Sequence, residues 1–403
     1  MLAEFPSRLH AFATVIVRVG LNLQPGQKLL IAEPYELQGV ARSARGLVEA
    51  VQVAAGREID VIWGDEARLR DFAERADWNG FERLVEANAR RMKKHLAERG
   101  AFLFLVGSQP RLLDGIGAER TGLLNRIAWQ HFGPIVQKLT RGASQWVLAP
   151  APSPEWAEAA FAQLPQAERE PALWSAIFSA CRCDTAEPVP AWEKQLARLA
   201  AGRDGLNRRR LKKLRYHGAG TDLTVSLPGG HTWCTARMTT KAGISFVANL
   251  PTEEVFTAPH LSSAEGTARV SRPINYGGAV IDGVELRFAD GCVRSAKARV
   301  GEDLLRRLLA TDGGAHRLGE VALVGEALRQ FTNSDAPAEP PEANAWARHR
   351  LFYHTLLDEN SSNHIALGES YPFCNQSFFP FSLNRSLIHV DLPLEAEVTF
   401  SPA

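Results

Sequence analysis

The sequence has few cysteines and no long apolar run. Its five cysteines are scattered over 403 residues, a pattern typical of proteins in a reducing compartment rather than of disulfide-bonded scaffolds. No apolar run reaches the roughly 18 residues that a membrane-spanning helix requires. Glu4 and Pro6 interrupt the region where a secretory signal would have its apolar core. We therefore expect a soluble, cytoplasmic protein.

An excess of charge of either sign is also missing. The chain has 46 Lys and Arg residues against 45 Asp and Glu residues, so its formal net charge is +1. Broad binding to nucleic acids or acidic membranes requires a basic surface. The basic run at residues 208–213 is short and has no interleaved aromatic residues. We expect neither nucleic acid nor membrane as a partner, which leaves chemistry on small molecules or peptides.

The first half of the chain lacks the glycine fingerprint of dinucleotide-binding proteins and the lysine motif of phosphate-binding loops. It has instead an alternation of short apolar runs with long helix-like segments. This spacing predicts a doubly wound parallel sheet that serves as scaffold, partner surface or substrate wall. The predicted strands are residues 28–32, 59–63, 101–106 and 145–148.

The sequence pattern changes near Gly205, from long helix-like segments to short β-rich units. At 403 residues the chain is too long for one ordinary core, so two domains are expected. Short β-rich units such as residues 223–227 predominate after this point. We predict an N-terminal α/β domain, residues 1–205, and a C-terminal α+β domain, residues 206–403.

Two acidic residues of the second half stand in apolar surroundings. Glu254 lies in an extended apolar stretch bounded by prolines, and Glu320 opens the apolar run 321–324, which is typical of a buried strand. Because burying an unpaired carboxylate is costly, each acid is expected to face a partner. The simpler alternatives are that Glu254 pairs with Arg269 or Lys241 and that Glu320 is a solvent-facing acid at the start of a strand.

Further metal-type residues gather near the C-terminus. Glu359 and His364 lie close together in sequence, and His389 and Asp391 are two residues apart. Two such residues on a strand point to the same side of the sheet, so they could share a zinc-type site. A buried imidazole oriented by a carboxylate is the alternative. Tyr371 could donate a hydrogen bond to a developing oxyanion, or it could be an ordinary core tyrosine.

The number of candidate ligands favours two metal ions. One ion needs three or four ligands, whereas two ions about 3.5 to 4 Å apart, joined by a bridging carboxylate, would use all six. Two such ions would activate a bridging water as a nucleophile and polarise a carbonyl, which favours hydrolysis. The six candidate ligands are Glu254, Glu320, Glu359, His364, His389 and Asp391.

The same motifs resemble those of the aminopeptidase T and aminopeptidase S family of metallopeptidases, over almost the full length. Residues 249–257 and 318–324 are similar to the motifs that supply the family's first two ligands, here Glu254 and Glu320. Residues 358–368 resemble its glutamate and histidine pair, which implies Glu359 and His364. The final ligands, His389 and Asp391, come from residues 388–391, and Tyr371 aligns with the family's catalytic tyrosine.

This resemblance implies a cytoplasmic exopeptidase that releases N-terminal residues from short peptides. It also implies two divalent ions per chain, chosen from zinc, cobalt or magnesium, a homodimer, and attack by a hydroxide that bridges the two metals. Glu253, next to a predicted ligand, is a candidate for reading the free substrate amine.

Two features depart from the family pattern. Asn363 stands before the ligand histidine, where a cysteine or small residue is expected. After Asp391 family members usually continue into a glycine-containing strand and hairpin, whereas this sequence has a short tail. We expect such a tail to be poorly anchored and to loosen the second metal.

Two other functions remain as alternatives. His364, His389 and Asp391 also form a set of two histidines and one carboxylate suited to a mononuclear iron dioxygenase acting on a small aromatic molecule. The three additional glutamates argue against this assignment. An inactive paralogue that serves as a binding protein is the third candidate, although all six ligands and Tyr371 are present.

Overall fold

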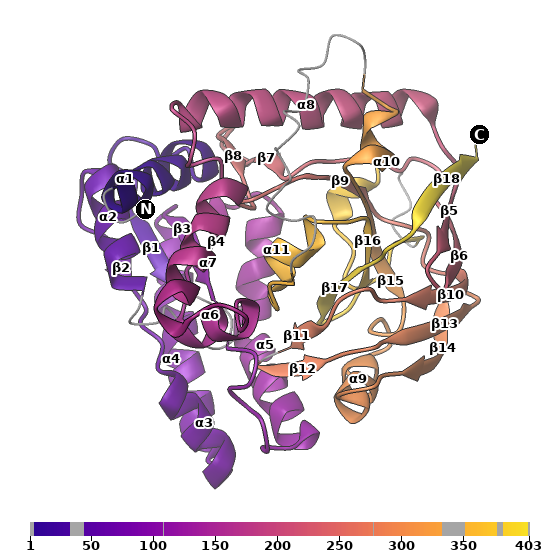
Figure 1. Ribbon diagram of the computed structural model, residues 1–403, viewed down its shortest axis with the longest axis horizontal. Helices are drawn as coiled ribbons and strands as arrows, with labels where there is room; N and C mark the ends of the chain where they lie inside the picture. Colours follow the sequence, from indigo (N-terminus) through magenta and orange to yellow (C-terminus); the bar gives the residue numbers. More distant parts are fainter. Residues whose placement is uncertain are drawn as a thin grey trace.

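The computed structural model describes residues 4–32, 44–107, 109–276, 278–332, 351–376 and 382–401. The N-terminal helices and parallel strands lie on one side of the molecule, and the antiparallel strands of the C-terminal half lie on the other (Figure 1). The predicted fold class is confirmed, because a parallel sheet comes first and antiparallel sheets follow.

The N-terminal sheet is parallel and has the strand order β2-β1-β3-β4. Its central strands are short and continuously apolar because helices cover both faces. All four predicted strands are confirmed, with ends that shift by one or two residues. The strands are β1 (Leu29–Ala32), β2 (Asp60–Val61), β3 (Ala101–Val106) and β4 (Trp146–Pro150).

Alternate residues of these strands face two different cores. Leu103 packs with one set of helices, whereas Phe102 and Phe104 pack with another, as the two-residue period of a strand requires. The sheet is therefore doubly wound, as predicted. One face carries α1 (Phe5–Val15), its π-helical extension η2 (Ile16–Gly20), α2 (Arg45–Ala55), α6 (Pro154–Ala160) and α7 (Gln166–Ala180), and the other carries α3 (Glu66–Arg75), α4 (Trp78–Ala97) and α5 (Ala118–Thr140).

Helix α8 (Pro188–Arg209) connects the two halves of the molecule. It runs across the top of both in Figure 1. Trp192 and Leu196 of this helix pack in a core of the N-terminal half, whereas Leu199 and Leu206 pack in the core of the C-terminal half. The predicted boundary at residue 205 lies inside this helix, and the division into two domains stays a prediction.

The C-terminal half contains a six-stranded antiparallel sheet of order β14-β13-β10-β6-β5-β18. The tail after Asp391 forms its edge strand, since Val398 pairs with Tyr216 and Phe400 with Leu214. The expectation of a poorly anchored tail was therefore wrong: ladder hydrogen bonds hold it. The strands are β5 (Lys213–Gly218), β6 (Thr221–Ser226), β10 (Glu265–Arg269), β13 (Glu285–Ala289), β14 (Cys292–Lys297) and β18 (Glu397–Ser401), with α9 (Glu302–Leu309) and α10 (Glu326–Arg329) nearby.

A four-stranded antiparallel sheet of order β17-β16-β15-β9 forms the centre of this half. Gly368 ends its strand β16 with φ of +102°, and a Cβ there would lie 2.1 Å from the carbonyl oxygen of Ile388. Only glycine permits this close approach to the segment before β17. The strands are β9 (Glu254–Thr257), β15 (Leu318–Val324), β16 (His364–Gly368) and β17 (His389–Pro393).

Shorter elements complete the structure around this sheet. The segment before β9 continues the N-terminal sheet, because Leu148 of β4 donates a hydrogen bond to Ala248 and accepts one from Leu250. The edge of one half therefore leads directly into the strand of Glu254. The remaining elements are β7 (Arg237–Thr239), β8 (Ser245–Val247), β11 (Ile274–Tyr276), β12 (Ala279–Ile281), α11 (Thr355–Glu359) and the 3-10 turn η4 (Pro372–Cys374).

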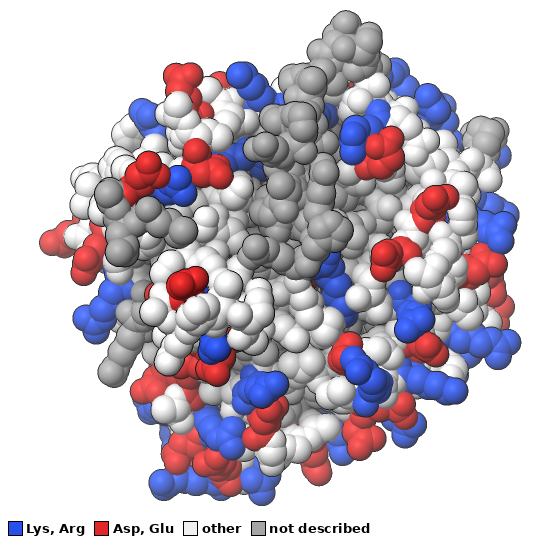
Figure 2. Space-filling model, in the orientation of Figure 1, with Lys and Arg blue, Asp and Glu red and all other residues white. Residues whose placement is uncertain are grey.

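The surface mixes charges of both signs. On the face drawn in Figure 2, outside the grey atoms, basic and acidic side chains alternate and neither sign forms a continuous patch. Within the described ranges, no helix has both the length and the apolar character needed to cross a membrane.

Candidate metal centre

The four-stranded sheet brings five of the six predicted ligands onto one face. Ala366 pairs with Glu320 on one side and with Asp391 on the other, so these two acids share a face. His364 lies two residues before Ala366 on the same face, and the two-residue period also adds His389 and Glu254.

The opposite face of this sheet is apolar. Val321, Leu323, Ile365 and Leu392 are fully buried there, in the core of the C-terminal half. The apolar side chains on this face therefore fix the orientation of the sheet, because a slip of one residue would exchange the two faces. Small residues between the ligands leave space on the site face.

Glu320 lies between two histidines. Its Oε1 atom is 3.7 Å from His364 Nε2, and its Oε2 atom is 3.5 Å from His389 Nε2. Glu254 Oε2 lies 3.0 Å from His364 Nε2, and Asp391 Oδ1 lies 3.4 Å from His389 Nε2. The result is two groups of three donors, Glu254–Glu320–His364 and Glu320–His389–Asp391, each with ligand atoms within 4.8 Å of one another.

Glu359 joins this cluster from outside the sheet. It is the last residue of α11, is buried, and belongs to neither group of three, but it lines the same cavity as the other five ligands. Its carboxyl shares a hydrogen bond with Asp391. All six predicted ligands therefore meet at one place.

Burial and mutual attraction shift the pKa values of the cluster. Burial raises the pKa of Glu320 to about 7 and raises the pKa of Glu359 well above its usual range. Burial alone would lower the pKa of His389, but attraction to Asp391 and Glu320 and the hydrogen bonds to Asp391 and the Glu369 backbone together outweigh burial and raise the pKa to about 9. Burial also opposes the charged form of His364, but hydrogen bonds to Glu254 and Glu320 and attraction to Glu254 and Asp391 together raise its pKa well above the usual range.

Asp391 shows the opposite shift. Burial opposes its ionisation, yet the charges of His389 and His364 and the hydrogen bonds from His389 and Glu359 together outweigh burial and lower the pKa of Asp391 to about 2. Without metal, the cluster therefore keeps Asp391 ionised only because neighbouring groups such as His389 remain protonated.

This donor set fits divalent cations. Four carboxylates face two imidazoles in a cavity whose described lining includes no Lys or Arg. Glu254, Glu320 and His364 are each less than 5% exposed, so water does little to offset their charge. Oxygen and imidazole nitrogen are the ligands that zinc and related ions accept.

Tyr371 stands at the wall of the cavity. It immediately precedes η4, and its ring stacks on Phe373 at 5.3 Å between centroids and contacts His389 at 5.1 Å. Asn249, which also lines the cavity, has a buried Oδ1 atom that no hydrogen bond among the described residues satisfies. Both side chains can therefore face a bound molecule.

The cavity widens away from the ligands. Beyond Tyr371 and His389 it opens into a space of about 240 Å³. Val106, at the carboxyl end of β3, and Leu148, in the middle of β4, contribute to its wall. The carboxyl ends of strands are where open α/β sheets commonly present ligands. The N-terminal half therefore forms part of the site wall.

The simpler interpretations of the acidic residues are not what the structure contains. Glu254 pairs with His364 rather than with Arg269 or Lys241. Glu320 is buried rather than solvent-facing. His389 and Asp391 do form an imidazole–carboxylate pair, but Glu320 extends it into the larger cluster.

Glu253 points away from the cavity, so its predicted contact with a substrate amine was wrong. Its side chain is fully buried and lies 2.6 Å from Arg182 and 3.0 Å from Arg198. Gln195 also donates a hydrogen bond to it at 2.8 Å. These partners, from α8 and the turn before it, leave no face of the carboxylate for a ligand.

Sequence reasoning missed the residues that support the ligands from behind. Asn360 accepts a hydrogen bond from the backbone N–H of Glu253 at 2.7 Å and donates a weaker one to Glu359 at 3.4 Å. Asn360 therefore connects the residue just before β9 with the last residue of α11. Asn363, an apparent departure from the family pattern, accepts a hydrogen bond from Val324 N and so ties β15 to the start of β16.

Comparison with known proteins assigns the family. The family described as thermophilic metalloprotease (M29) matches residues 5–399. Aminopeptidase T of Thermus thermophilus is 36% identical over 399 residues, which cover 98% of this chain and 93% of that protein. The chain belongs to the M29 thermophilic metalloproteases. Membership of this metalloprotease family agrees with the cation-binding chemistry of the cluster.

Other M29-type relatives give the same result. Aminopeptidase 2 of Geobacillus stearothermophilus is 36% identical over 397 residues, covering 96% of this chain and 92% of that protein. The solved structure of wild-type AmpT from Thermus thermophilus aligns with a TM-score of 0.82 at 35% identity, covering 99% of this chain and 98% of that one. A solved dioxygenase structure from Pseudomonas putida KT2440 aligns at a TM-score of only 0.47 and 12% identity, which carries no argument about function.

The buried position of Glu253 leads to a prediction about stability. Glu253→Gln keeps the shape of the side chain but leaves Arg182 and Arg198 without their buried counter-charge, which typically costs about 3–5 kcal/mol. Urea unfolding of the metal-free protein measures this change. The control is Glu86→Gln, which removes an exposed ion pair with Arg90 and is expected to change stability little. Equal stability of the two variants would contradict the role given to Glu253.

Proposed function

We propose that this protein is a metal-dependent aminopeptidase whose six clustered ligands hold two divalent cations, chosen from zinc, cobalt and magnesium. The observation that carries the proposal is the position of Glu320, whose two oxygens face different histidines 3.7 and 3.5 Å away. A carboxylate in this position is suited to bridge two cations. The names of the relatives support the same activity.

Each ligand group would hold one cation. Glu254 and His364 flank Glu320 on one side, and His389 and Asp391 flank it on the other, with Glu359 next to Asp391. When bound, the two cations would polarise a scissile carbonyl and activate a water for attack. His389 is oriented for this task because its Nδ1 lies 2.8 Å from the carbonyl oxygen of Glu369, leaving Nε2 for the cation.

Tyr371 is the proposed catalytic side chain. Stacking on Phe373 and contact with His389 hold its ring beside the ligands. Its phenol would donate a hydrogen bond to the negative charge that develops on the substrate carbonyl oxygen.

The shape of the cavity supports an exopeptidase. Its inner end, among the ligands, is small and is walled by Trp146, Met238, Phe256 and Phe373. A chain end fits such a space better than the middle of a long chain does. The homodimer and the cytoplasmic location expected from the family resemblance stay predictions.

Metal content tests the proposal directly. Chelator-treated protein is expected to lose turnover and to recover it on binding two zinc or cobalt ions per chain, measured by elemental analysis and titration calorimetry. Glu320→Ala removes the shared ligand and is expected to lose at least one ion together with turnover. Glu326→Ala, at an exposed position on α10, should keep both. Full activity in chelator would refute the proposal, and one iron per chain would favour the dioxygenase instead.

The binding of metal should also depend on pH. Glu320, Glu359, His364 and His389 all have raised pKa values, so the metal-free cluster retains protons near neutrality that cations must displace. Affinity is therefore expected to fall from pH 8 to pH 6, by about tenfold per pH unit for each displaced proton. Zinc titrations in buffers of different ionisation enthalpy count the released protons. An affinity that is constant over this range would show that the ligands are already deprotonated.

The role of Tyr371 leads to a further prediction. Tyr371→Phe keeps the ring contacts but removes the phenolic donor, and loss of one oxyanion donor typically lowers kcat by about 10²–10³. Metal content should remain at two ions per chain. Tyr216→Phe is the control, because the buried hydroxyl of Tyr216 has no hydrogen-bond partner among the described residues and lies in the core. A Tyr371→Phe enzyme with normal kcat would exclude the proposed role.

A further inference from the structure

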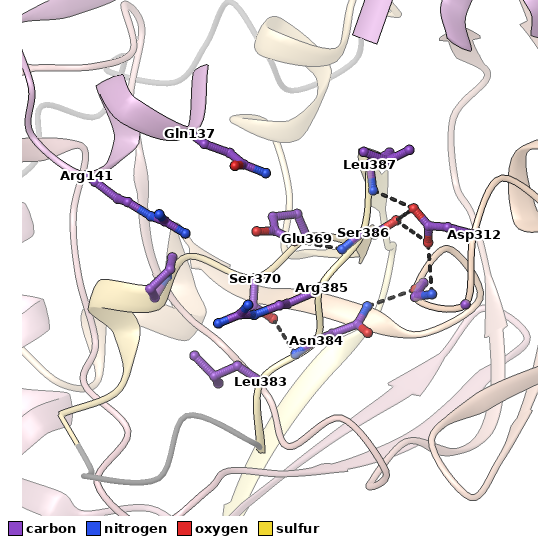
Figure 3. A pocket seen from close by; sticks show the side chains of 13 residues that line it. Gln137, Arg141, Asp312, Glu369, Ser370, Leu383, Asn384, Arg385, Ser386 and Leu387 are labelled. Carbon is purple, nitrogen blue, oxygen red and sulfur yellow. Dashed lines mark hydrogen bonds between the residues drawn. The ribbon is translucent and has the colours of Figure 1, made fainter. Parts of the chain in front are cut away.

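A second polar pocket adjoins the wide part of the active-site cavity. It has a volume of about 460 Å³ and lies between α5 and the loop that leads into β17 (Figure 3). Gln137, Arg141, Glu369 and Ser386 line both this pocket and the active-site cavity. The two spaces therefore form one continuous cleft that begins at the metal ligands.

Two arginines supply the positive charge of this outer pocket. Arg141 follows directly on the end of α5, and Arg385 lies in the loop before β17; both extend toward the space beside Ser370 and Glu369 (Figure 3). Among the described residues, neither guanidinium has a carboxylate oxygen within 4.0 Å, although many other arginines of the chain do.

The acids of the pocket are occupied by the loop itself. Glu369 accepts a hydrogen bond from Ser386 N at 2.6 Å. Asp312 accepts hydrogen bonds from Ser386 Oγ at 2.9 Å and Leu387 N at 2.6 Å, and from Gly314 N at 2.8 Å. These contacts hold the loop that carries Arg385. Glu369 attracts both arginines electrostatically but does not contact either.

The two ends of the cleft therefore offer different chemistry. Its inner end carries the metal ligands, whereas its outer end has two guanidinium groups that no carboxylate of the described residues contacts, beside Glu369 and Asp312, whose oxygens accept hydrogen bonds from the loop. A short peptide places its first peptide bond near one end and a free carboxylate at the other. Guanidinium is the side-chain group best suited to bind a carboxylate, since it offers paired donors in a plane.

We propose that Arg141 and Arg385 bind the C-terminal carboxylate of short peptide substrates and thereby orient them with the N-terminus at the metal ligands. This inference rests on the proposed aminopeptidase function and names its substrate class, namely short peptides with a free C-terminal carboxylate. Arg141, which lines both parts of the cleft, makes the main contact, and Arg385 assists from the outer side.

Matched substrates test the subsite within each enzyme. The series Leu-Gly, Leu-Gly-Gly and Leu-Gly-Gly-Gly is assayed as free acids and as C-terminal amides, and the ratio of kcat/KM for acid over amide is compared. The wild-type ratio is expected to reach about ten to a hundred at one peptide length, the factor that a hydrogen bond to a charged group typically contributes. In the double variant Arg141→Gln with Arg385→Gln the ratio should fall to about one.

The control is Lys138→Gln, which removes a positive charge from the same helix at an exposed position that lines neither part of the cleft. It should keep the wild-type ratio and exclude an effect of overall charge. A wild-type ratio near one at every length, or a ratio unchanged in the double variant, would overturn the subsite. Hydrolysis of leucine p-nitroanilide, which has no carboxylate, separates this result from failure of the proposed function: if the wild-type enzyme does not cleave it or any peptide, the function itself is wrong.

Discussion

The site depends on the carboxylate of Glu320, which is buried on a strand between two imidazoles. Its surroundings raise its pKa to about 7, because burial disfavours the charge more than the histidines favour it. A carboxylate in this state is costly for the protein alone. The ionised carboxylate becomes favourable once cations bind. The buried charge that destabilises the metal-free protein would therefore contribute to the affinity for metal.

The surrounding architecture maintains this arrangement from both sides. Beneath the sheet, the apolar residues Val321 and Ile365 fix which face Glu320 and His364 occupy. Behind β9, the buried ion pairs of Glu253 with Arg182 and Arg198 attach the ligand strand to α8. Because α8 also packs in the N-terminal core, the position of Glu254 depends on both halves of the chain. Support of this kind is what keeps ligands close enough to share cations.

Local sequence patterns were sufficient for much of this structure. The apolar runs that form β1 and β3 are short and continuous. Because long helical segments connect successive strands, the sequence predicts a parallel sheet. All six proposed ligands were named from their settings and from the family resemblance, since a charge in an apolar run stands out in a sequence. Glu253 stood out for the same reason, yet its carboxylate faces arginines more than fifty residues earlier in the chain. Neither its sequence setting nor its adjacency to Glu254 could distinguish a buried ion pair from a ligand.

The errors share a physical cause, which is that long-range pairing is not encoded locally. The tail after Asp391 has the alternating pattern of β18, but whether it is anchored depends on the free edge of β5, some 180 residues earlier in the chain. The outer pocket is a stronger example, because Arg141 and Arg385 lie in unremarkable sequence and gain significance only through Asp312 and Glu369, which hold the loop between them. A guanidinium without a carboxylate is favourable only while it remains hydrated or binds an anion. In a cleft that leads to the metal ligands, a short peptide with its own carboxylate at the far end would supply that anion.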